Sequence, residues 1–346
     1  MNTKILTILA TVAISIATSA WSADATPPRV WAGEAPGVAI SSMTCPPSGF
    51  HKPIWGAFGG NDGIRHPYEI AGPCYSQLVK DAALANGLLH SKPSGLKAVM
   101  STRFSATGSW VDPVAGPIRL ETLTMHNHYF YPGSRTQVWG TRANGEKYFN
   151  SLVVNDGRAW DETVSRGVGP RPAPAGAERE RAVYNSLLPQ GAMLSIVEAE
   201  GTAKAGKDSQ GRNTITGKSP FEPWTVNVTL DDRHRIIRSE VRYGGDTYVA
   251  DFIGYHNAST EYDPVGNKWE PSYLVDFPDR LVWTKNGRPM ADLTTTEMKS
   301  NPYVVLPYPE FLKAEIEPAN PSFGYDKNNP GDDPRGLFEQ EAKGVP

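Results

Sequence analysis

The fold is decided by a stretch that reads Tyr-Leu-Val-Asp-Phe-Pro-Asp-Arg-Leu-Val-Trp-Thr over residues 273–284, Lys-Asn-Gly over 285–287 and Arg-Pro-Met-Ala-Asp-Leu-Thr-Thr-Thr-Glu-Met-Lys over 288–299. Two runs rich in β-forming residues flank Asn-Gly, the strongest short-range hairpin signal, because a type I′ turn needs positive φ at both central residues. We therefore expect an antiparallel hairpin that completes a meander of strands begun upstream.

Upstream of the hairpin, apolar residues recur with a period of two from Leu96 onward, which is typical of half-buried strands. Pro132-Gly133, Asn144-Gly145 and Asp156-Gly157 supply turns between them. The predicted strands are 99–108, 118–131, 136–141, 148–154, 158–163, 194–200, 224–230, 236–243 and 247–255. Helical spacing predicts helices over 77–89 and 175–188. Residues 169–174 suggest a proline-rich linker, and residues 204–220 a long loop or flap.

The predicted order is a helix, five strands, a second helix and then about six strands. An antiparallel sheet of that size must curl or split to hide its apolar face. We expect a mainly β (α+β) fold, an antiparallel, curled half-open β-barrel covered by two or three helices. The expected domain occupies residues 74–307, and an extended tail occupies 308–346.

The first 23 residues are typical of an export signal. Lys4 is their only charge, residues 5–16 form an apolar or small run, and small residues follow. The run is short for a membrane span, which needs about 20 residues. We expect cleavage after Ala20 or Ser22 and a periplasmic or secreted protein of the Gram-negative type, with no transmembrane anchor.

Charge and composition exclude some partners. Without Lys4 the chain has 33 basic and 37 acidic residues, a formal net charge of −4, which argues against a nucleic-acid surface. The 30 prolines and 33 glycines favour many turns over a helical bundle. Residues 24–73 are rich in proline, glycine and aromatics, so we expect an ordered extension there.

The sequence contains only two cysteines, Cys45 and Cys74. In an oxidising compartment two cysteines most simply form one disulfide. Closing a loop of about 30 residues would add roughly 3–4 kcal/mol on the chain-entropy model. A free reactive thiol or a metal ligand is the alternative, and no Cys-x-x-Cys motif supports either.

Residues 75–307 resemble one known family. The resemblance is carried by the helix at 77–89, the strand 95–104 with Thr107-Gly108, and the pattern over 277–302 that includes Phe-Pro-Asp-Arg-Leu-Val-Trp, Gly-Arg-Pro-Met-Ala-Asp-Leu-Thr and Asn-Pro. They are similar to the exported half-barrel domains related to periplasmic lipoprotein carriers, and most similar to variants beside or fused to metallo-β-lactamase-fold hydrolases. The resemblance implies an unclosed barrel with an apolar concave cavity, and it brings no catalytic signature.

His126-Asn127-His128 is the sharpest local motif. On a strand both imidazoles share one face, where they could bind Zn²⁺ if another strand supplied a third ligand. The sequence continues with Tyr129-Phe130 and lacks the Asp-His of the metallo-β-lactamase motif His-x-His-x-Asp-His, so that motif is absent and we assign no metal. As acid–base groups, His126 and His128 would combine with Asp251 and His256 from another strand. The plainer alternatives are histidines without metal and an Asp251 paired with an arginine.

Aromatic residues recur along the predicted strands, and tryptophan and tyrosine can line a pocket with an apolar face and one polar group. About half of them are expected to be core. The candidate ligand-binding residues are Tyr129, Trp139, Tyr148, Trp160, Phe252 and Trp283.

Three hypotheses follow. The first is a periplasmic carrier that holds a small apolar molecule or lipid in a half-barrel cavity and needs no cofactor. The second is an exported lyase, isomerase or hydrolase that acts on a small hydrophobic compound through histidine and aspartate. The third is a structural subunit with an envelope protein partner.

Overall fold

The computed structural model describes residues 75–88, 90–92, 95–97, 99, 101–129, 133–155, 157–164, 168–199, 203–218, 223–257, 259–263, 268–271, 276–300, 302, 304 and 306–312. The expected signal peptide, the extension at 24–73, the Cys45–Cys74 disulfide and the tail beyond 312 lie outside these residues.

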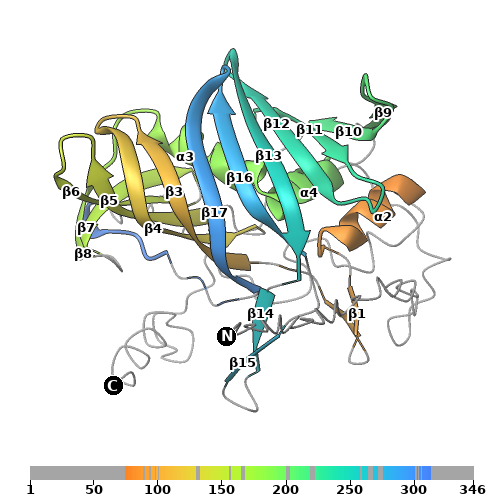
Figure 1. The fold of residues 1–346 in the computed structure, drawn as a ribbon, viewed down its shortest axis with the longest axis horizontal. Coiled ribbons are helices and arrows are strands. Elements are labelled where there is room, and N and C mark those ends of the chain that lie inside the picture. Colours follow the sequence, from red (N-terminus) through yellow and green to blue (C-terminus); the bar gives the residue numbers. More distant parts are fainter. Residues whose placement is uncertain are drawn as a thin grey trace, which may run out of the picture. The chain divides into compact units, whose positions relative to one another are not determined.

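One open, antiparallel sheet organises the described chain (Figure 1). Its strands, in sheet order, are β8 (Val168–Pro172), β7 (Arg158–Val164), β6 (Lys147–Asn155), β5 (Gly133–Arg142), β4 (Gly116–His128), β3 (Ser101–Asp112), β17 (Arg288–Ser300), β16 (Phe277–Lys285), β13 (Asp246–His256), β12 (Ile236–Tyr243), β11 (Thr225–Leu230), β10 (Asn213–Lys218) and β9 (Lys204–Lys207). The prediction of a mainly β, antiparallel fold is confirmed.

Four short strands complete the β-structure. β14 (Ser259–Asp263) pairs in parallel with β17, and β15 (Lys268–Pro271) pairs with β14. β1 (His90–Lys92) and β2 (Gly95–Lys97) form a separate two-stranded sheet.

The described helices are α2 (Gln77–Ala85), α3 (Ala177–Leu187) and α4 (Pro189–Glu198). α3 packs against β5, β6 and β7 and also against β12 and β13, while α4 packs against β10, β11 and β12. Four strands, β4, β3, β17 and β16, separate the two sets that α3 contacts. One helix can reach both sets only because the sheet curves around it, as Figure 1 shows.

The Asn286-Gly287 hairpin between β16 and β17 is confirmed. Both residues have positive φ, 52° and 73°. The Asn286 side chain also ties this turn to the neighbouring hairpin, because its Oδ1 accepts from the Thr247 amide at 2.8 Å and its Nδ2 donates to Asp246 at 2.7 Å.

Three predictions for irregular or β segments were wrong. Residues 194–200 were expected to be a strand, but most of them belong to α4, which is buried along nearly its whole length and therefore lacks an amphipathic pattern. The proline-rich linker is mostly the edge strand β8, and the expected loop at 204–220 is the hairpin β9–β10.

The first helix ends earlier than predicted. α2 stops at Ala85, and Asn86 caps it with a backbone N–H that donates to Ala82. The Asn86 side chain then donates to the His234 carbonyl at 3.1 Å and accepts from the Ile236 amide at 3.1 Å. Asn86 therefore binds the end of α2 to the start of β12.

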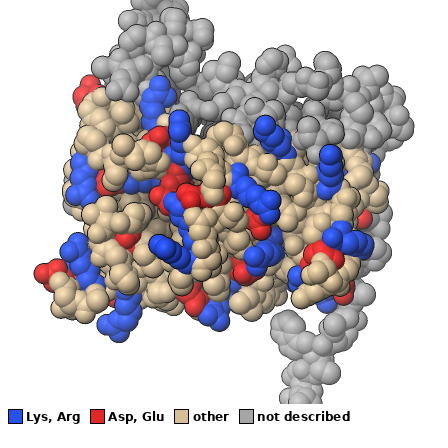
Figure 2. Space-filling view, turned by 90° about the horizontal axis from the view of Figure 1, so that it is seen from above, with Lys and Arg blue, Asp and Glu red and all other residues tan. Residues whose placement is uncertain are grey.

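The two faces of the sheet differ in chemistry. The face toward the helices carries most of the large buried residues, whereas the other face carries cross-strand ion pairs such as Arg238–Asp251 at 2.7 Å. Arg280 and Asp292 form a second such pair at 2.6 Å. Figure 2 shows basic and acidic side chains interspersed on the visible described surface. We call the two sides the helix face and the outer face.

Candidate functional site

The centre of the helix face is aromatic. Trp110 from β3 and Trp283 from β16 lie with ring centroids 6.2 Å apart, and Tyr184 from α3 lies 5.7 Å from each ring. All three are buried. The Nε1 atoms of Trp110 and Trp283 have no hydrogen-bond partner within the described chain. The core therefore contains two neighbouring indole rings whose N–H donors are buried without a partner in the described chain.

A chain of polar side chains crosses the same face toward α4. Thr102 and Tyr129 bring their hydroxyl oxygens to 2.7 Å, and the Tyr129 hydroxyl donates to Gln190 Oε1 at 3.4 Å. Asn127 Nδ2 donates to Thr102 Oγ1 at 3.5 Å. The Tyr129 hydroxyl has one hydrogen, and it donates this hydrogen to Gln190 Oε1. In the contact between Thr102 and Tyr129, Thr102 must therefore be the donor. The chain therefore runs in one direction, from Asn127 through Thr102 and Tyr129 to Gln190.

Both ends of this polar chain are incomplete within the described residues. Asn127 Oδ1, an acceptor, and Gln190 Nε2, a donor, are buried without partners, and both side chains are fully buried. Asn185 adds a second acceptor, because its Nδ2 donates to the His128 carbonyl at 3.0 Å while its Oδ1 has no partner. A buried donor or acceptor without a partner lowers the stability of the fold by about 1–3 kcal/mol. Three such atoms therefore suggest that a further group pairs with them.

Burial fixes the protonation of Tyr129. Desolvation raises the pKa of its phenol far above the usual range, and the hydrogen bond from Thr102 offsets only part of that effect. The hydroxyl therefore stays protonated at any physiological pH. Tyr129 can donate and accept hydrogen bonds in this chain, but it cannot act as a base.

The junction between α3 and α4 places Gln190 in the interior. α4 begins with Pro189, whose fixed φ suits the first helical position. A Cβ on Gly191 would lie 2.0 Å from the Asn185 carbonyl oxygen and 3.3 Å from the Tyr129 ring. Only glycine allows the two helices to approach so closely beside Tyr129.

Four of the six predicted ligand-binding aromatics lie on the helix face. Tyr129, Tyr148, Phe252 and Trp283 are all buried there, and Tyr148 donates to Asp112. Only Tyr129 belongs to the polar chain.

The other two predicted aromatics lie on the outer face. Trp160 is fully buried and donates from Nε1 to Glu162 at 3.2 Å, whereas Trp139 is exposed and packs on Phe149 with centroids 4.0 Å apart. The predicted set therefore does not form one surface.

The predicted acid–base residues are not brought together. His126 and His128 do share the outer face of β4, as their spacing indicated, but β3, β17 and β16 separate β4 from β13. Four interstrand steps of about 4.8 Å place His256 roughly 19 Å away along the sheet. Asp251 pairs with Arg238, the plainer alternative, and His256 Nδ1 contacts the Asp279 carboxylate.

Burial lowers the pKa of His128 to about 4, so this imidazole is neutral at pH 7. No group of three or more metal-ligating side chains occurs among the residues that the structure describes. Over the same residues, none of the helices has the length and apolar character needed to cross a bilayer.

Sequence reasoning missed most of the polar chain. It singled out Tyr129 as an aromatic and passed over Thr102, Asn127 and Gln190. The available signal was Asn127, since it alternates with Leu123 and Met125 on the apolar face of one strand. A fully buried amide at such a position needs hydrogen-bond partners. No family model matches the chain, and no curated protein matches it either.

Proposed function

We propose that this protein binds a small, mostly apolar molecule or lipid between the helix face of the sheet and helices α3 and α4. The observation that carries the proposal is the polar chain with its unpaired ends inside an apolar core. Ligand sites are commonly apolar with a few convergent polar groups that fix orientation.

The unpaired atoms define the polar group of the ligand. Gln190 Nε2 offers a hydrogen to an acceptor, and Asn127 Oδ1 offers a lone pair to a donor. A ligand hydroxyl, protonated carboxyl or amide group can pair with either of these atoms. The apolar remainder would gain about 25 cal/mol per Å² of buried surface, so no cofactor is needed for affinity.

The proposed setting is outside the cytoplasm, as a carrier of the half-barrel type. The apolar run at 5–16 supports export. The curved, open sheet with α3 against its inner side supports the half-barrel. N-terminal sequencing of the protein from a periplasmic fraction tests the export step by showing whether residues 1–20 or 1–22 have been removed.

The binding proposal is tested by native mass spectrometry of the purified protein, followed by solvent extraction. We expect a bound apolar compound that carries a hydroxyl, carboxyl or amide group. Nile red, a neutral apolar probe, should compete with that compound. A protein that carries no extractable compound and leaves Nile red unbound would contradict the proposal.

A pair of variants locates the site. Gln190→Met keeps the volume of the side chain and removes its donor, and loss of one buried hydrogen bond should weaken retention of the compound by about tenfold. Gln210→Met makes the same change in the exposed β9–β10 turn and should retain the compound normally. Equal retention by folded forms of both variants would remove the polar chain from the site.

A further inference from the structure

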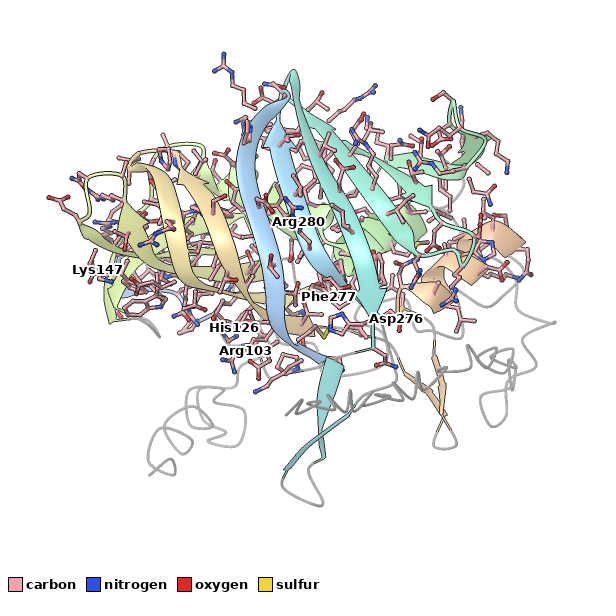
Figure 3. The ribbon with its side chains drawn as sticks, viewed as in Figure 1. Arg103, His126, Lys147, Asp276, Phe277 and Arg280 are labelled. Atoms are coloured by element: carbon pink, nitrogen blue, oxygen red, sulfur yellow. The ribbon has the colours of Figure 1, made fainter. Side chains whose placement is uncertain are left out.

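Four basic side chains form a row across adjacent strands on the outer face. Lys299 on β17 lies opposite Arg103 on β3, Arg103 opposite His126 on β4, and His126 opposite Arg135 on β5. Figure 3 shows Arg103 and His126 close together toward the lower ends of β3 and β4. We call these four residues the basic row.

Such a row is unfavourable unless negative charge compensates it. Directly opposed like charges on antiparallel strands destabilise a sheet. Acids compensate the two ends, because Glu162 binds Arg135 through two contacts of 2.9 and 3.0 Å and Glu297 lies 3.1 Å from Lys299. Arg103, between these ends, has no such acidic partner among the described residues.

Arg103 has no counter-ion in the described structure. No hydrogen bond or ion pair involves its side chain within the described residues, and its Nε is buried without a partner. The residue as a whole is half-buried. A partly desolvated guanidinium without an acceptor is costly, because burial of a charge must be offset by pairing.

A second row of uncharged polar residues lies two positions along the same strands. Ser105 is opposite Thr124, Thr124 opposite Gln137, and Gln137 opposite Ser151. The hydroxyls of Ser105 and Thr124 are 3.3 Å apart. These hydroxyls lie on the same face as Arg103 and His126, one pleat away, at about 7 Å along each strand.

We propose that Arg103 binds a small oxyanion on the outer face, with the hydroxyls of Ser105 and Thr124 as additional donors. The ligand group is a carboxylate or a phosphate, since a guanidinium donates two parallel hydrogen bonds to either. His126, opposite Arg103 on β4, flanks this site. The site lies on the face of the sheet opposite the polar chain, so it is independent of the proposed apolar ligand.

The test follows the Nε–H signal of Arg103 by ¹⁵N NMR while inorganic phosphate or acetate replaces chloride at constant ionic strength. Arg103→Gln identifies the signal. We expect one of the two anions to shift it in a saturable way. A response to phosphate alone assigns a phosphate site, and a response to acetate alone assigns a carboxylate site. No shift with either anion would overturn the proposal.

Calorimetry with the responding anion provides the second measurement. Arg103→Gln should weaken binding by about 10- to 100-fold, the worth of a charged hydrogen bond. Arg242→Gln is the matched control, because Arg242 lies exposed on the same face, 2.7 Å from Glu240, and outside the basic row. Equal weakening in the two variants would indicate nonspecific charge attraction and would also overturn the proposal.

Discussion

At the scale of single residues, the outer face offers a comparison between two similar ion pairs. Arg135 and Glu162 form a bidentate pair that is almost fully buried, with Ser151 Oγ and Trp160 Nε1 also donating to Glu162. Arg280 and Asp292 form an equally bidentate pair with about half of each side chain exposed. Geometry is the same in both, so burial should decide their energetic importance.

Glu162→Gln should lower the free energy of unfolding by about 3–5 kcal/mol, because it leaves Arg135 buried without its counter-ion. Asp292→Asn should change it by less than about 1 kcal/mol, since solvent screens the exposed pair. Urea denaturation of the two variants measures both values. Similar losses in the two would show that burial is not the deciding factor.

The protonation of a single residue, His128, should make the stability of the protein depend on pH. Burial lowers its pKa to about 4 from the ordinary 6.5, so between those values the unfolded chain binds more protons than the folded one. The free energy of unfolding should therefore decrease as pH falls from 6.5 to 4. His128→Asn should flatten this part of the curve, as measured by urea denaturation at a series of pH values, and an unchanged slope would contradict the assignment to His128.

At the scale of elements, the segment that follows β17 covers part of the outer face. Leu306 packs with Val153 and Trp160, and its carbonyl accepts from Asn155 Nδ2 at 2.9 Å. Tyr308 and Leu312 extend this cluster, so packing continues beyond the expected boundary at residue 307.

Leu306→Ala should destabilise the protein by about 2–4 kcal/mol through the lost burial and the cavity that remains. Phe311→Ala removes a larger side chain that is 40% exposed, and its effect should be smaller. Chemical denaturation compares the two. A larger effect of Phe311→Ala would show that Leu306 is not the main packing contact of this segment.

The β16–β17 turn permits a backbone test. Gly287 has a φ of 73°, where a Cβ costs about 1–2 kcal/mol. Gly287→Ala should reduce the free energy of unfolding by that amount, although a Cβ there would meet no atom within 4 Å. Gly206→Ala, in strand β9, is the control, since its φ is not positive, and it should have little effect.

The elements that were predictable are those with local signals. Period-two alternation identified β3 to β7 and β11 to β13, and Asn286-Gly287 identified the last hairpin, because turn conformation and side-chain alternation depend on near neighbours. α4 was mistaken for a strand because its burial on all sides is set by tertiary contacts. Gln190 was missed for the same reason, since its partner Tyr129 lies far away in the sequence.

At the scale of the whole described sheet, the edges are protected against association. β8 and β9 each pair with only one neighbour within the described chain. β8 contains Pro170 and Pro172, which lack an N–H to offer, and β9 carries Lys204 and Lys207 with every residue exposed. Prolines and lysines on edge strands discourage pairing with other chains.

Replacing Pro170 and Pro172 together by valine should therefore promote self-association through β8. Light scattering after size exclusion, over a range of protein concentrations, measures the change in mass. Pro174→Ser, just outside the strand, is the control and should behave as the unmodified protein does. A double variant with unaltered mass would show that the prolines do not protect this edge.

The central pairing of β3 with β17 also has a consequence for how the chain folds. Thr102 pairs with Ser300, so the middle of the sheet joins residues from opposite ends of the described sequence. Contacts of such high sequence separation form slowly, because a long loop must close before they yield any stabilisation. During synthesis, strands β3 to β8 can pair with one another, but the edge of β3 stays unpaired until the β17 residues up to 300 have been made. The protein is thus expected to complete the centre of its sheet late in folding, after the strands on either side of it have formed.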